Sequence, residues 1–370
     1  MNRLTTGRAP ATPNPLPARA AAPDPSTPTP AEERAGVLSP IGLSKCHDDH
    51  ALAMAAHRFI EGRPLDHRDR DLLSAHCGDR VEVLAAMQRL RPDFTPVMTP
   101  MKPDGAAFDA RVQSTLHRLQ AALDHGLAFE ILIDDTPLPD EVMEALARTL
   151  AAPNARLTAF HFHAPWADSA HDRDANAARL HGLCAGLDAY ASLQAVSGGP
   201  GVLWLLNRPV GHLSLAFERA PDGDTLERLE RVLVNGVAAL TCTADEAAAF
   251  PEVARVVQTA NRHASPESAV RSVRLVYPFR APRNDASGVD AADRLLNTPH
   301  LQRLTLPGTE WLNLVSDDQL VACIRRFGLQ ALNFDSVFTL SPEVQQALAA
   351  NSSTAATTVH RPTDLGVTPL

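Results

Sequence analysis

The C-terminal part of the chain carries one pattern twice, and this repeat restricts the possible folds more than any other feature. In residues 301–351, a short run with apolar residues at its first, fourth and sixth positions precedes a turn and an amphipathic helix pattern. The first copy opens at Leu301, and the second opens 28 residues later at Leu329. Because so short a unit cannot bury its apolar face alone, the repeat predicts an array of stacked strand–helix units.

The same register extends back through residues 127–360. Seven segments place apolar residues at positions 1, 4 and 6, and they open at Ala128, Leu157, Val210, Val237, Val270, Leu301 and Leu329. The interval from Leu157 to Val210 is 53 residues, so we expect one further unit there, with its strand over residues 193–196. A last strand is expected near residues 356–360. Alternating strands and helices predict parallel strands joined by crossover helices.

This register resembles the long, helix-containing class of leucine-rich repeats, the ribonuclease-inhibitor-like horseshoe. The resemblance covers about 230 residues and rests on unit lengths of 27–33 residues. It implies an α/β solenoid with parallel strands on the concave face and helices outside. The chain departs from the family at position 9, where residues such as Glu218 and Asp245 replace the expected Asn or Cys. We therefore expect an irregular horseshoe, with a (β/α)8 barrel as the alternative, since about eight units also suit that fold.

Residues 41–126 lack the strand–helix register. Helical periodicity predicts helices between Ser44 and Gly62, over residues 66–77, over 79–90 and over 106–125, with one short strand in the Pro-rich stretch before the last of them. An open repeat array needs a terminal unit that covers the exposed end of its core. We therefore expect residues 41–126 to form a helical cap.

The first forty residues contain nine Pro, many Ala, Ser and Thr, and no aromatic residue. Such a segment buries too little apolar surface to offset its ordering entropy, which predicts a disordered leader. It also lacks the apolar core of a Sec signal peptide. A leader of this kind before a folded body resembles the secretion leader of bacterial type III effectors. That resemblance implies delivery into a host cell, and the cytoplasm is the expected location otherwise. Residues 361–370 are expected to be a tail.

Composition excludes several other classes. The net charge of −9 argues against a nucleic-acid partner, because phosphate binding requires clustered Lys and Arg. No run of 18 apolar residues exists, so no membrane span is expected. The five Cys are scattered and odd in number, which indicates reduced thiols, with Cys242 and Cys323 as small core residues. We expect a monomer that binds a protein.

Side chains alternate along a strand, so positions 3, 5 and 7 of each unit would face the concave, solvent-exposed side. The predicted partner-binding face consists of Glu130, Leu132, Asp134, His161, His163, His212, Ser214, Thr241, Arg274, Arg303, Thr305, Asn333 and Asp335. Tyr277 and Trp311 lie just past strands, where they are candidates either for interface anchors or for packing under loops.

His161 and His163 are the sharpest chemical signal. Two residues apart on one strand, they point the same way and are candidate metal ligands, as in barrel-type hydrolases that begin their metal site with His-x-His. The other interpretation is two solvated histidines on a concave surface. The Gly-rich stretch 197–201 lacks the Lys of a phosphate loop and is expected to be a turn after a strand. No cofactor and no catalytic residue is predicted.

These features together favour a non-enzymatic scaffold, a secreted bacterial effector that binds a host protein through its concave face. One alternative is a metal-dependent hydrolase that uses His161 and His163 on a barrel. Another is an adaptor that recruits a host ligase through residues 41–126. An open horseshoe leaves its first and last strands unpaired, whereas a barrel pairs them, so the sheet distinguishes these architectures.

Overall fold

The computed structural model describes residues 50–78, 80–100, 107–133, 138–163, 182–183, 185, 193–277, 286–312, 315–335 and 340–357. The expected leader, the capping residue Ser44 and the expected tail lie outside these ranges. The description below concerns the part of the chain within them.

The described strands form a single parallel sheet, in which the spatial order is the order along the chain. The strands are β1 (Val97–Met98), β2 (Ala128–Ile133), β3 (Arg156–Phe162), β4 (Ala195–Gly198), β5 (Val210–Phe217), β6 (Val237–Ala244), β7 (Ser272–Val276), β8 (Arg303–Leu306) and β9 (Ala331–Phe334). Successive parallel neighbours require a crossover connection after each strand. The sheet is open, since β1 lies at one edge and β9 at the other.

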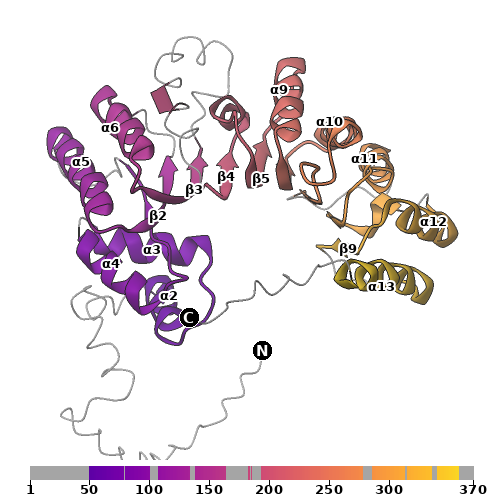
Figure 1. Cartoon of the computed structure of the whole chain (residues 1–370), viewed down its shortest axis with the longest axis horizontal. Coiled ribbons are helices and arrows are strands. Elements are labelled where there is room, and N and C mark those ends of the chain that lie inside the picture. Colours follow the sequence, from indigo (N-terminus) through magenta and orange to yellow (C-terminus); the bar gives the residue numbers. More distant parts are fainter. Residues whose placement is uncertain are drawn as a thin grey trace, which may run out of the picture.

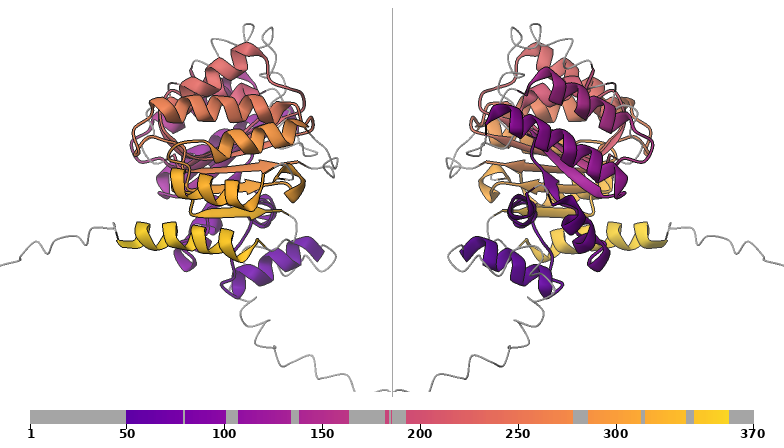
Figure 2. Two further views of the ribbon diagram at one scale, coloured as in Figure 1. Left: turned by 90° about the vertical axis from the view of Figure 1, so that its right-hand side faces the viewer. Right: turned by 90° about the vertical axis from the view of Figure 1, so that its left-hand side faces the viewer.

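Helices cover most of the outer side of the curved sheet (Figure 1). The described helices are α2 (His50–Ile60), α3 (His67–Cys77), α4 (Val81–Leu90), α5 (Phe108–Asp124), α6 (Asp140–Ala151), α9 (Gly223–Val234), α10 (Ala249–His263), α11 (Ala286–Leu296), α12 (Asp317–Phe327) and α13 (Pro342–Thr357), with the short 3-10 helices η4 (Pro200–Leu205) and η5 (Thr309–Leu312). α3 lies along the β1 edge instead and contacts residues of the inner face. Figure 2 shows the two ends of the arc, with α12 and α13 at one and the N-terminal helices at the other. No described helix combines the length and the apolar character needed to cross a membrane.

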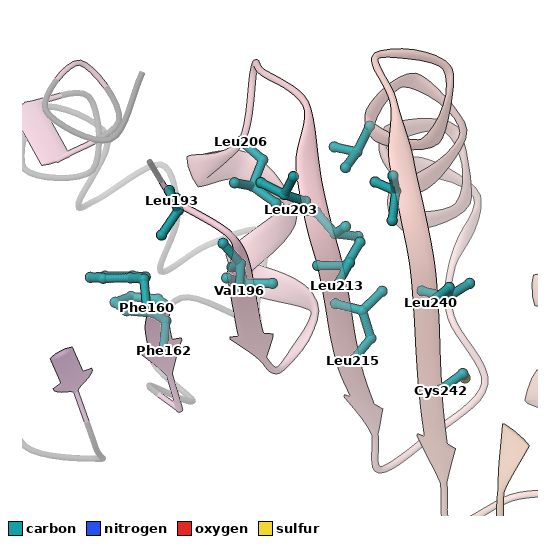
Figure 3. Packing of buried hydrophobic residues seen from close by; sticks show 14 of the residues in the cluster. Phe160, Phe162, Leu193, Val196, Leu203, Leu206, Leu213, Leu215, Leu240 and Cys242 are labelled. Atoms are coloured by element: carbon teal, nitrogen blue, oxygen red, sulfur yellow. The ribbon is translucent and has the colours of Figure 1, made fainter. Parts of the chain in front are cut away.

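The apolar positions predicted from the sequence form the core between sheet and helices. Leu213 and Leu215 on β5 and Cys242 on β6 are at most 1% exposed, and Figure 3 shows them on the side of the sheet that faces the helices. The expected hidden unit is present as β4, where Val196 pairs in register with Leu213. That strand begins two residues later than predicted. The predicted strand register is thus confirmed.

Amide side chains on three helices bond the backbone where strands begin. Asn261 of α10 donates to the Val270 carbonyl and accepts from its N–H, both at 2.9 Å. Gln88 of α4 makes the equivalent pair of bonds with Ala128, at 2.8 and 2.9 Å, and Asn351 of α13 donates to the Leu329 carbonyl at 2.9 Å. Val270, Ala128 and Leu329 are all position 1 of a repeat unit. These amides satisfy backbone groups at the points where the strands begin.

The structure corrects one expectation and decides two others. The strand expected near residues 356–360 is absent from its described part, because α13 continues to Thr357. The short strand expected in the Pro-rich stretch is present as β1, and it joins the sheet as the edge strand beside β2. Trp311 is fully buried against Phe250, which agrees with packing under a loop, and Tyr277 is half-buried beside the same ring.

Candidate functional site

Side chains at two strand positions form two rows across the inner face of the sheet. The first row consists of Glu130, Ala159, Ala195, His212, Ala239, Ser272, Arg303 and Ala331, each paired in register with the next. The second consists of Leu132, His161, Ser197, Ser214, Thr241, Arg274, Thr305 and Asn333. The structure therefore brings together residues that the sequence separates by a whole repeat unit, which supports the alternation used to predict them.

Most of the predicted face is accessible to solvent. The exposed members are His163, His212, Arg274, Arg303, Asn333 and Asp335, and the half-buried ones are Leu132, His161, Ser214, Thr241 and Thr305. Asp134 lies outside the described residues. Glu130 is the exception, since only 5% of it is exposed.

Polar contacts also link strands on the exposed part of this face. Arg274 on β7 donates to the Asp335 carboxylate at 3.0 Å, and 54% of the arginine side chain is exposed. Such an exposed pair contributes about 0–1 kcal/mol to stability, because water screens it and its side chains lose entropy. Nearer the middle of the sheet, His212 Nε2 lies 2.9 Å from Thr241 Oγ1. Because the Arg274 side chain is largely exposed, its charge remains accessible to a partner.

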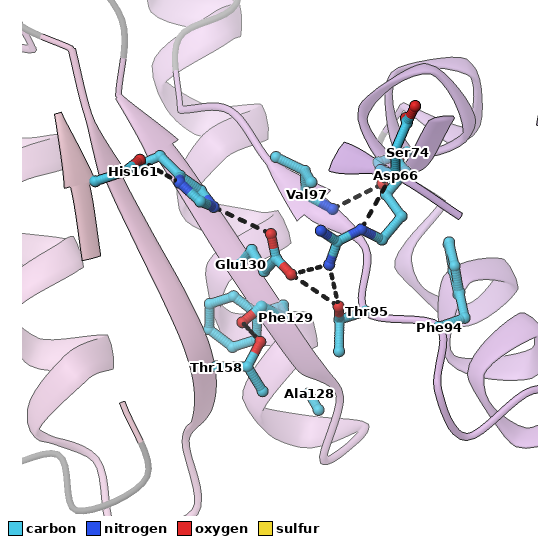
Figure 4. A network of polar contacts seen from close by, with 12 residues as sticks. Asp66, Ser74, Phe94, Thr95, Val97, Ala128, Phe129, Glu130, Thr158 and His161 are labelled. Carbon is cyan, nitrogen blue, oxygen red and sulfur yellow. Dashed lines mark hydrogen bonds and ion pairs between the residues drawn. The ribbon is translucent and has the colours of Figure 1, made fainter. Parts of the chain in front are cut away.

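A buried polar cluster lies at the N-terminal end of the face. It depends on where α3 begins, because the Asp66 carboxylate caps this helix by accepting the Asp69 N–H at 2.8 Å. That start makes His67 the first helical residue and puts Arg70 one turn later on the same side of α3. From there the Arg70 guanidinium reaches Glu130 on β2, which Figure 4 shows between His161 and Thr95.

Glu130 has a hydrogen-bond partner on each carboxylate oxygen. Arg70 and the Thr95 hydroxyl donate to Oε1, the latter at 2.9 Å, and His161 Nε2 lies 3.1 Å from Oε2. Burial alone would raise the pKa of Glu130, but the His161 hydrogen bond, the Arg70 charge and the Thr95 hydrogen bond together lower it below 4.5. The carboxylate is thus ionised at neutral pH and covered by α3. This arrangement does not suit the partner contact predicted for Glu130.

His161 links this carboxylate to a serine on the next strand. Its Nδ1 lies 2.7 Å from Ser197 Oγ. Because an ionised carboxylate only accepts hydrogen bonds, Nε2 carries a proton toward Glu130, and in the neutral ring Nδ1 then accepts from the Ser197 hydroxyl. Ser197 and Gly198 belong to β4, so the turn predicted over residues 197–201 begins only after Gly198.

A chain of serine, imidazole and carboxylate is the arrangement that activates a nucleophile in many hydrolases. Such catalysis also needs free N–H donors beside the nucleophile, to stabilise the developing oxyanion. Ser197 lies inside β4, which pairs with β3 on one side and β5 on the other. The sheet therefore occupies the backbone groups around Ser197, and the geometry favours a structural or ligand-binding role over acyl transfer.

His67 completes the cluster from the helix side. Its ring meets that of His161 edge to face, with centroids 4.5 Å apart. Within the described part of the chain, His67 Nε2 is buried and has no hydrogen-bond partner. Burial, followed by the proximity of His161, lowers the pKa of His67 below 6.5. The ring is therefore neutral at pH 7, with one nitrogen lone pair available.

Three of these side chains form a potential ligand set. Among the described residues, His67, Glu130 and His161 each place one ligand atom within 4.8 Å of the other two. His163, the predicted companion of His161, is exposed beyond the end of β3 and does not belong to this group. The sequence indicated His161 and Glu130 but missed His67, Arg70, Thr95 and Ser197. The predicted helix over residues 66–77 gave the turn that carries His67 and Arg70, but nothing in the sequence showed where that helix would pack.

No protein-family model matches this chain, and a search of curated proteins finds no similar sequence. The functional inference therefore rests on the geometry described above.

Proposed function

We propose that this chain is a non-enzymatic protein-binding scaffold, built as an irregular leucine-rich-repeat horseshoe whose concave face binds a host protein. The observation that carries the proposal is the pair of side-chain rows that crosses the inner face from β2 to β9. The helices leave this side of the sheet uncovered over most of its length (Figure 1). The open edges at β1 and β9 support a solenoid over a closed barrel.

The chemistry of the rows indicates what the partner must supply. Ala195 and Ala239 in the first row are small and half-buried, so the middle of the face has room for larger side chains of a partner. Arg274, which pairs with Asp335, and Arg303 lie on the adjacent strands β7 and β8, and both are exposed. Two arginines beside one carboxylate leave a net positive charge, which favours an acidic segment on the bound protein and speeds its association.

The cellular setting that we propose is that of a secreted bacterial effector acting in the host cytoplasm, which the composition of residues 1–40 supports. The hydrolase alternative has less support, because His163 lies apart from the cluster that contains His161. Among the described helices α2 to α4, we find no arrangement that favours the ligase-recruiting adaptor.

Reversing two charges on the proposed face tests the function. We expect the Arg274→Glu, Arg303→Glu double variant to lose about tenfold or more in affinity for the partner, because acidic partner groups would then meet like charges. The partner is first captured from host extract with the full chain and identified by mass spectrometry. The dissociation constants are then measured with the purified partner at two salt concentrations, since the wild-type interaction should weaken with salt.

The matched control places the same charge change on the outer helices. Arg231 on α9 and Arg255 on α10 are exposed and pair with Glu227 and Glu252 on their own helices. The Arg231→Glu, Arg255→Glu variant should bind as tightly as the wild type. Equal affinities for all three proteins, or equal losses in both variants, would show that the concave face does not bind this partner.

A further inference from the structure

We propose that His67, Glu130 and His161 bind a divalent transition-metal ion, with Zn²⁺ as the best match, and that this ion ties α3 to the sheet. The three side chains come from α3, β2 and β3, whose residues are far apart in sequence. One ligand atom from each lies within 4.8 Å of the other two. This site is independent of partner binding on the exposed part of the face.

The donor set fits the metal. Two imidazoles and one carboxylate are a common protein ligand set for Zn²⁺, with bonds of about 2.0–2.2 Å. In a tetrahedral site, two ligand atoms at that distance from one ion lie about 3.3–3.6 Å apart. The 3.1 Å between His161 Nε2 and Glu130 Oε2 is close to this spacing. All three ligand atoms lie within 4.8 Å of one another, so binding requires His67, at the first position of α3, to move toward the other two by at most about 1.5 Å.

The surrounding contacts prepare two of the ligands. Arg70 and Thr95 both use Glu130 Oε1, which leaves Oε2 for the ion. The Nδ1 atom of His161 lies 2.7 Å from Ser197 Oγ. When Nε2 binds the ion, the ring proton moves to Nδ1 and is donated to Ser197 Oγ. Such an outer hydrogen bond fixes the ring tautomer and orientation in metal sites.

The third ligand, His67, has a feature that a simple hydrogen-bonded network does not explain. His67 Nε2 is buried and lacks a hydrogen-bond partner among the described residues. Leaving a buried polar atom without a partner is costly, so each such atom calls for an explanation, and here two other potential metal ligands lie beside it. An ion beside His161 and Glu130 would give His67 the missing partner.

The charges of the cluster set a limit on affinity. The Arg70 guanidinium already neutralises Glu130, so the dication enters a site with little net negative charge. We therefore expect weaker binding than at a site of four thiolates. With three protein ligands, a fourth position remains open for water or an anion, as in zinc sites that are not purely structural.

Zn²⁺ titration of the chelator-treated full chain, followed by calorimetry, tests the site. We expect the His67→Ala variant to bind one equivalent less than the wild type, and Zn²⁺ to raise the thermal midpoint of the wild type by several degrees more than that of the variant. Co²⁺ in place of Zn²⁺ should give visible absorption bands that the variant lacks. The Glu130→Gln variant should weaken binding by about tenfold or more.

His163→Ala is the matched control, because it removes a histidine two residues from His161 without touching the cluster, and it should bind Zn²⁺ like the wild type. Circular dichroism establishes that each variant is folded before its titration. If His67→Ala and wild type bind the same number of ions with the same affinity, or if His163→Ala loses the site, the proposal is wrong. The outcome says nothing for or against the scaffold, whose partner affinity is measured separately.

Discussion

Replacing Gly198 with Ala will destabilise the protein by about 3 kcal/mol, at the upper end of the range for overpacked positions. A Cβ atom on Gly198 would lie 1.9 Å from the backbone oxygen of Phe162 and 2.8 Å from its carbonyl carbon. Both atoms belong to β3, which pairs directly with β4 at this position. Because the obstacle is backbone within a sheet, a rotamer change cannot relieve the clash. Urea unfolding followed by circular dichroism measures the loss.

The Gly223→Ala substitution provides the control. Gly223 is the first residue of α9, and a Cβ atom there would have no other atom within 4 Å. Removing a glycine from an unobstructed helical position changes stability little or raises it by about 0.4–1 kcal/mol. Similar unfolding midpoints for Gly198→Ala and the wild type would mean that β4 is not held against β3 in the way described.

The sheet was largely predictable because its signal is local. Apolar residues at positions 1, 4 and 6 define which side of a strand is buried, and that pattern can be read from each unit alone. β4 was harder to place, since its unit departs from the regular spacing, and its start was predicted two residues early. The short strand expected in the Pro-rich stretch is present as β1, but its membership of the sheet was not predicted, because Val97 and Met98 offer no repeat register to align.

The candidate site was predictable only where it coincides with the repeat. Glu130 and His161 followed from strand alternation, but His67 and Arg70 sit on a helix outside the register. Their approach to Glu130 depends on how α3 packs against β1, which is a tertiary contact that helical periodicity does not encode. The burial of Trp311 is likewise a tertiary contact that the sequence does not show. It depends on Gly288 of α11, where a Cβ atom would lie 2.3 Å from the indole ring.

The Arg70→Met substitution is expected to destabilise the protein by about 2–3 kcal/mol, because it removes the cation from a buried ion pair while keeping most of the side-chain volume. Glu130 would remain ionised, with only 6% of its side chain exposed, and would keep just the Thr95 and His161 hydrogen bonds. Equilibrium unfolding at pH 7 measures the effect. The same substitution at Arg274, whose pair with Asp335 is exposed, should cost about 0–1 kcal/mol.

The pH dependence separates this electrostatic loss from a loss of packing. The pKa of Glu130 is lowered in the folded state, so its contribution to stability is fully present above about pH 4.5 and disappears as the pH falls through the folded value. Arg70 is one cause of that lowering, so the difference between wild type and Arg70→Met should be largest near neutral pH and shrink below pH 4.5. In a double-mutant cycle, adding Glu130→Gln should recover part of the loss, since no buried charge is then left unpaired. A deficit that stays constant with pH and is not reduced by Glu130→Gln would mean that Arg70 stabilises α3 through its aliphatic stem alone.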